Sequence, residues 1–147
     1  MGVDNRVSDR FVGWLKNCLG QFDSDAARMQ CLEGLADMQD IPNIEIVERL
    51  LLKTLREDSN SVVRHEAAFV LGRLHKNRQS ISEKIILALF QSARTDRSII
   101  VRHEATEVLG KLKDSRIPLM LSELAKDSNV DVATTAKLGL EYQTLQC

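Results

Sequence analysis

The residues best suited to chemistry are two His-Glu pairs at matching places in the sequence. His65-Glu66 and His103-Glu104 lie 38 residues apart, and each pair follows an arginine and precedes an alanine. Imidazole nitrogens and carboxylate oxygens bind first-row transition metals, and two histidines with one carboxylate and open positions are typical of non-haem iron that binds oxygen. The pattern therefore predicts a metal site formed by His65, Glu66, His103 and Glu104.

A structural role for the same motif is the alternative. Glutamates before an alanine in helical repeats often form ion pairs on the helix surface, and Arg64 and Arg102 could pair with carboxylates of neighbouring helices. The third histidine, His75, falls at the expected end of a helix. We interpret it as a partner of the negative end of the helix dipole and not as a ligand.

The His-Glu pairs belong to an internal repeat. Residues 62–72 read VVRHEAAFVLG, and residues 100–110 read IVRHEATEVLG. Weaker copies at 27–35 and 132–140 have Met-Gln and Thr-Thr in place of His-Glu. A spacing of 31 to 38 residues between copies accommodates two helices and two turns, which is typical of HEAT-like repeats.

The elements that must position these residues are helices. Apolar residues recur three or four positions apart, and short turns rich in Asp, Ser and Asn at 58–61, 96–98 and 127–129 supply N-caps. The predicted helices span 6–20, 25–38, 43–57, 60–75, 80–94, 98–112, 116–126 and 130–145. We therefore expect an all-α fold, an α-solenoid of about four HEAT-like helix pairs in a single domain covering 1–147, with the second helices forming one layer.

Composition narrows the class of protein. Hydrophobic residues make up 44% of the chain, and the formal net charge is −1. No basic run is interleaved with aromatic residues, so we expect no nucleic-acid partner. No apolar stretch is long enough to cross a bilayer, so we expect no membrane contact. The odd number of cysteines (Cys18, Cys31 and Cys147) favours reduced thiols in a cytoplasmic protein, with Cys18 and Cys31 in the core.

Equivalent positions on adjacent helices would bring the two histidines together. Packed helix axes lie about 8–10 Å apart, so the imidazoles of His65 and His103 could meet at one ion. Such a site would be open on one side. In a two-fold dimer the same patch faces itself, and four His-Glu pairs would then be available for a dinuclear centre. We therefore expect a homodimer with iron at its interface.

The same residues carry a resemblance to a known family. Segments 62–72, 100–110 and 127–146 resemble the deoxyhypusine hydroxylases, HEAT-repeat di-iron monooxygenases, and the similarity covers about 90 residues. That family has four His-Glu motifs, two in each half of a longer chain, and the halves hold two irons between them. The resemblance implies that this chain corresponds to one half. It also implies that His65, Glu66, His103 and Glu104 are ligands or supporting carboxylates.

Different functions remain open at this stage. The resemblance implies a di-iron monooxygenase whose substrate is a modified lysine on a translation factor. Glu33, Glu107 and Glu141 could form an acidic rim for a cationic amine, or they could be ordinary solvated residues. The alternative is a non-catalytic HEAT scaffold that binds partner helices or peptides. A general similarity to the repeats of phycobilin lyases identifies no bilin site. In each case the partner or substrate is a protein.

Overall fold

The computed structural model describes residues 5–20 and 24–146. This part of the chain forms eight helices: α1 (Asn5–Cys18), α2 (Asp25–Asp37), α3 (Ile44–Glu57), α4 (Ser61–His75), α5 (Glu83–Thr95), α6 (Ile99–Lys111), α7 (Ile117–Leu124) and α8 (Val130–Leu145). The predicted all-α fold is confirmed. None of these helices is long and apolar enough to span a membrane.

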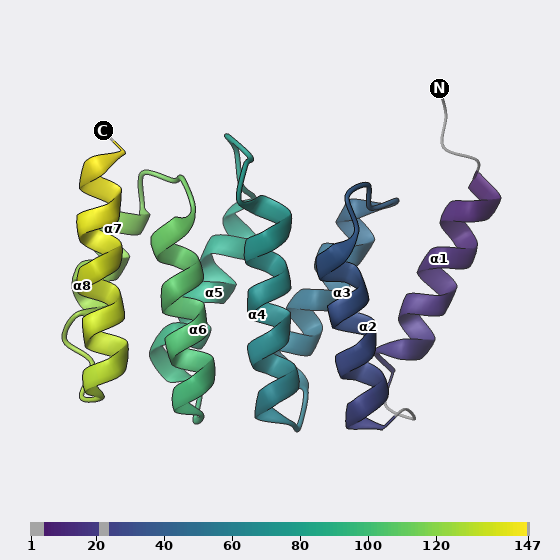
Figure 1. The fold of residues 1–147 in the computed structure, drawn as a ribbon, viewed down its shortest axis with the longest axis horizontal. Coiled ribbons are helices and arrows are strands. Elements are labelled where there is room, and N and C mark those ends of the chain that lie inside the picture. Colours follow the sequence, from purple (N-terminus) through teal and green to yellow (C-terminus); the bar gives the residue numbers. More distant parts are fainter. Residues whose placement is uncertain (1–4, 21–23, 147) are drawn as a thin grey trace.

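The helices stack as pairs in two layers. The second helices α2, α4, α6 and α8 lie side by side in one layer, and α3, α5 and α7 lie behind them (Figure 1). Each second helix contacts the next one along the chain as well as the first helix of its own pair. Helix α1 lies at one end of the stack, tilted against α2. The predicted layer of second helices is therefore confirmed, and it is the layer that carries both His-Glu pairs.

The predicted polar turns do begin the helices. The Asn60 side chain accepts a hydrogen bond from the backbone N–H of Val62, and Asn129 caps α8 in the same way. In each turn the preceding aspartate also accepts from the backbone N–H two residues later, with distances of 2.9, 2.8 and 2.8 Å at Asp58, Asp96 and Asp127. These bonds satisfy groups that a helix start would otherwise leave without partners.

The same aspartates join successive repeats through a ladder of arginines. The guanidinium of Arg64 on α4 donates to both carboxylate oxygens of Asp96, each at 2.9 Å. Arg28 forms the equivalent pair with Asp58 at 2.7 Å, and Arg102 lies 3.4 Å from Asp127. The expectation that the arginines of the motif pair across the stack is confirmed. Each pair links a second helix to the turn of the following repeat.

The repeated glycines mark where the second helices approach most closely. A Cβ atom added to Gly72 on α4 would lie 2.9 Å from both methyl carbons of Val108 on α6. A Cβ added to Gly110 would lie 3.0 Å from the Cα of Gly139 on α8. Around these contacts the core is filled by aliphatic side chains, in keeping with the low aromatic content. Small residues therefore set the spacing of the layer that holds the candidate site.

Two smaller predictions have different outcomes. Cys31 is buried and Cys18 partly buried, both as free thiols, as predicted, while Cys147 lies outside the described residues. His75 does end α4, but only 2% of it is exposed, and burial lowers its pKa to about 4. Its Nε2 lies 3.1 Å from Glu48 Oε1, so His75 contacts a side chain of α3, and the burial that lowers its pKa opposes the predicted charge interaction with the helix dipole.

Candidate metal site

The four residues predicted to bind a metal lie on two neighbouring helices of the second layer. His65 and Glu66 are in the first half of α4, and His103 and Glu104 are at the corresponding place in α6. All four are partly buried. Helices α4 and α6 are in contact and run in the same direction (Figure 1). The repeat therefore places the two pairs at the same level of adjacent helices.

His65 and Glu104 connect the two pairs directly. His65 Nε2 lies 3.1 Å from Glu104 Oε2, with 33% of the His65 side chain and 12% of the Glu104 side chain exposed. This hydrogen bond raises the pKa of His65 above its ordinary value, although partial burial acts in the opposite direction. The register of the stack thus pairs the histidine of one repeat with the glutamate of the next.

A second grouping is formed within α6. One ligand atom each from His103, Glu104 and Glu107 lies within 4.8 Å of the others, and all three residues are partly buried. Glu107 was predicted only as a possible rim residue. Its place in this group could have been found from spacing, because it lies four residues after His103 and hence on the same face of the helix. Glu107 Oε1 also accepts a hydrogen bond from Lys111 Nζ at 2.5 Å, which lowers its pKa.

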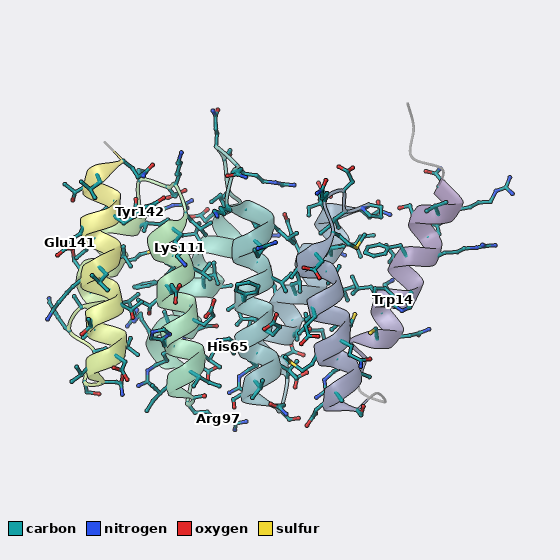
Figure 2. The ribbon with its side chains drawn as sticks, in the orientation of Figure 1. Trp14, His65, Arg97, Lys111, Glu141 and Tyr142 are labelled. Atoms are coloured by element: carbon teal, nitrogen blue, oxygen red, sulfur yellow. The ribbon has the colours of Figure 1, made fainter. Side chains whose placement is uncertain are left out.

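Glu66 and the other predicted rim glutamates have different surroundings. Burial raises the pKa of Glu66, and the neighbouring carboxylates of Glu33 and Glu104 raise it further, while His65 lowers it. Glu66 is therefore close to the cluster but outside the group of three on α6. Glu141 is exposed at the outer edge of α8, away from His65 (Figure 2). Of the predicted rim, Glu33 and Glu107 lie toward the cluster and Glu141 does not.

The donors in this cluster fit a divalent transition-metal ion. Donors on opposite sides of an ion with bonds of about 2.1 Å are about 4.2 Å apart, so the group on α6 needs only small side-chain movements to close. It supplies one imidazole nitrogen and two carboxylate oxygens, which are donor types that first-row transition metals bind. His65 could add a second imidazole nitrogen if it released its hydrogen bond to Glu104.

The cluster opens into two cavities. A cavity of about 310 Å³ is lined by both His65 and His103, together with Ile99, Ile100 and residues of α8. A larger one, of about 920 Å³, begins at His103, Glu104 and Glu107 and runs between the C-terminal halves of α4, α6 and α8. The side chains of the cluster are therefore accessible to an ion and to a larger ligand.

Comparison with known proteins agrees with this architecture. A structure of human deoxyhypusine hydroxylase in complex with glycerol superimposes with a TM-score of 0.73 and 23% sequence identity over 97% of this chain and 46% of that one. At this identity the likeness concerns the fold, and this chain spans about half the length of that enzyme. No curated protein sequence matches the chain. The family profile described as HEAT repeats matches residues 48–141, and the chain therefore belongs to the HEAT-repeat family.

Proposed function

We propose that this protein binds iron at the cluster on α4 and α6 and acts as a metal-dependent oxygenase of the deoxyhypusine hydroxylase type. The observation that carries the proposal is the grouping of His103, Glu104 and Glu107 within 4.8 Å, with His65 hydrogen-bonded to Glu104 from the neighbouring helix. The fold shared with human deoxyhypusine hydroxylase supports the same assignment.

The residues of the cluster would supply the metal ligands, and the pKa of His65 would affect how metal loading depends on pH. His103, Glu104 and Glu107 would hold the ion, and His65 would orient Glu104 or replace its own hydrogen bond with a bond to the metal. Bound iron would supply the activation of oxygen. Because the hydrogen bond to Glu104 raises the His65 pKa, a metal ion that binds this nitrogen competes with a proton, and loading is expected to weaken as the pH falls.

A homodimer would complete the site. The cluster lies on an open face of the second-helix layer, where one chain offers two imidazoles and three carboxylates. An isologous interface brings the same patch from both chains together, so two chains would supply four His-Glu pairs to a dinuclear centre. The substrate would be a side chain on a protein. The free thiols Cys18 and Cys31 support a cytoplasmic location.

Metal analysis tests the proposal directly. Protein reconstituted anaerobically with ferrous iron and then desalted is expected to retain about one iron per chain, since a dinuclear site in a dimer needs two. The variants His65→Ala and His103→Ala are expected to lose most of this iron while their helical circular dichroism stays unchanged, because both side chains are partly exposed.

Glu141→Ala is the matched control, because Glu141 is an exposed glutamate in the same layer outside both cavities. It is expected to load as the unmodified chain does. Iron retention well below about one per two chains, or equal retention by His103→Ala, would leave the non-catalytic scaffold as the function of this face.

A further inference from the structure

The larger cavity is a groove with two chemically different ends. It lies between the C-terminal halves of α4, α6 and α8 and has a volume of about 920 Å³. One end is at Glu104 of the acidic cluster. The other end lies beside the turns that follow α4 and α6. From Glu104 to Lys111 the helix rises about 10 Å, a distance that three or four residues of an extended peptide would cover.

Four cations surround the second end of the groove. Arg73 and Lys76 line it from α4 and the residue that follows, and Lys111 and Lys113 line it from α6 and the turn that follows. All four side chains are exposed. Of the acidic residues that line the groove, Glu104 lies at the opposite end, and Glu107 lies between the two ends, paired with Lys111. This end of the groove therefore carries a local positive charge although the formal net charge of the chain is −1.

Two of these cations have no counter-charge among the residues that the structure describes. Lys111 Nζ is paired with Glu107, and the guanidinium of Arg73 lies over the ring of Phe69 and donates to a backbone oxygen of α2. Across residues 5–20 and 24–146, Lys76 and Lys113 form no ion pair. The ammonium groups of Lys76 and Lys113, on opposite sides of the groove, can therefore bind carboxylates of a ligand.

Large apolar side chains line the same groove and remain exposed. Phe69 on α4 is 37% exposed, and Leu138 and Tyr142 on α8 are 60% and 44% exposed. Lys111 and Tyr142 lie near the same ends of the neighbouring helices α6 and α8 (Figure 2). Apolar surface next to unpaired cations suits a ligand that has both apolar and acidic groups.

We propose that this groove binds an extended acidic segment of a partner protein, with its carboxylates on Lys76 and Lys113 and its apolar side chains against Phe69, Leu138 and Tyr142. A peptide fits better than a nucleic acid, because a peptide can carry its carboxylates at the cation end alone, whereas phosphates recur along a whole nucleic-acid chain and would also face Glu104. The binding goes beyond the proposed iron chemistry and does not require a metal, so the two can fail separately.

Fluorescence anisotropy with a labelled peptide tests the proposal. The probe is Ser-Leu-Ser-Phe-Glu-Leu-Asp, which carries its acidic residues near one end and is titrated with the metal-free chain at low and at physiological salt. We expect saturable binding that weakens with salt, because exposed charges are screened. The same peptide with lysine at each acidic position is expected to bind at least about tenfold more weakly, and so is the peptide with serine at each apolar position.

Variants locate the binding on the groove. Lys76→Glu combined with Lys113→Glu is expected to weaken binding about tenfold or more, and Tyr142→Ala to weaken it by a smaller factor. Lys137→Glu is the matched control, because this exposed lysine of α8 lies outside the groove. Lys76→Gln with Lys113→Gln gives a second, milder test if the charge reversal alters the circular dichroism.

Three results would overturn the proposal. They are equal binding of the acidic and lysine peptides, unchanged affinity in both double variants, and tighter binding of a labelled oligouridine than of the acidic peptide. If iron loading fails while the acidic peptide binds as expected, the groove assignment stands and the oxygenase assignment does not.

Discussion

The Glu104 side chain contacts residues of two successive repeats. Its carboxylate accepts the hydrogen bond from His65 on α4, and it lies in one group with His103 and Glu107 on its own helix. With 12% of its side chain exposed, Glu104 is also the better shielded member of the His65–Glu104 pair. A carboxylate in this position can orient an imidazole or bind an ion, and these two roles compete for the same oxygen atoms.

His75 is the buried histidine of the chain, and it should control acid stability. The residue is 2% exposed, and its pKa of about 4 lies below that of an unfolded histidine. Between about pH 6.5 and pH 4 the unfolded chain therefore takes up a proton that the folded chain excludes. The free energy of unfolding should fall over this window by up to about 3 kcal/mol. Glu48, whose pKa is raised by burial, offsets part of this loss.

Urea unfolding at a series of pH values measures this effect. In His75→Leu the decline between about pH 6.5 and pH 4 should be much shallower, since the titrating group is gone. His65 does not interfere in this window: its pKa is raised, so its stabilisation is fully present below about pH 6.5 and is lost as the pH rises through its folded value. An equally steep decline in the variant would contradict the role of His75.

The sequence predicted which residues of the site share a surface but not which atoms meet. The repeat correctly places His65-Glu66 and His103-Glu104 at the same level of adjacent helices. The contact between His65 and Glu104 depends on how far α6 is rotated and shifted against α4, and a repeat spacing does not fix that. The burial of His75 likewise depends on tertiary packing and not on its place in the helix.

At the scale of the element, small residues let the second helices lie close together. Gly72 faces Val108, and Gly110 faces Gly139, at distances that leave no room for a side chain. Gly34, in α2, has no atom within 4 Å of the place where a Cβ would be. These glycines therefore make a matched test of whether helix propensity or close packing dominates.

Gly34→Ala should stabilise the protein by up to about 1 kcal/mol, because alanine is the better helix former. Gly72→Ala gains the same propensity but forces the added carbon to within 2.9 Å of two Val108 methyl groups. Its free energy of unfolding should lie about 1–3 kcal/mol below that of Gly34→Ala. Urea denaturation of both variants measures the difference, and equal stabilities would show that α4 and α6 separate without cost.

Helix boundaries were predictable wherever a polar turn supplied a cap. The segments predicted at 60–75, 98–112 and 130–145, which follow the three polar turns, agree with α4, α6 and α8 to within one residue at each end. The largest shift is at α5, which begins at Glu83 and not at residue 80. Ile81 is apolar and extends the helical pattern, but it is 6% exposed and packs into the core from the turn that precedes the helix.

At the scale of the whole molecule, the chain is a short stack with one face that could complete a metal centre. The match to human deoxyhypusine hydroxylase covers 97% of this chain and 46% of that enzyme. It therefore concerns the whole stack of repeats and not a single repeat. The second-helix layer carries the cluster, both cavities and the exposed apolar residues Phe69, Leu138 and Tyr142 that line the larger cavity. A partner, whether a second copy or another protein, is therefore expected at that layer.

Dimerisation through the site should depend on iron. Light scattering after size exclusion is expected to give twice the chain mass of 16.6 kDa for the reconstituted protein and a single chain mass after chelation. Glu104→Ala should remain a single chain under both conditions, because it removes a ligand and the partner of His65 together. A mass that chelation leaves unchanged would contradict a metal-bridged interface, even if iron binds within each chain.

The contact between His65 and Glu104 also limits how this site can be inherited when repeats are gained or lost. Since its two halves belong to different repeats, neither repeat carries the pair alone. Repeat proteins grow and shrink by gaining or losing single units, and such an event between α4 and α6 would separate the partners without changing either residue. The smallest heritable unit of the site is thus two consecutive repeats, and lineages of short HEAT proteins that exchange single repeats should lose the site and keep the fold.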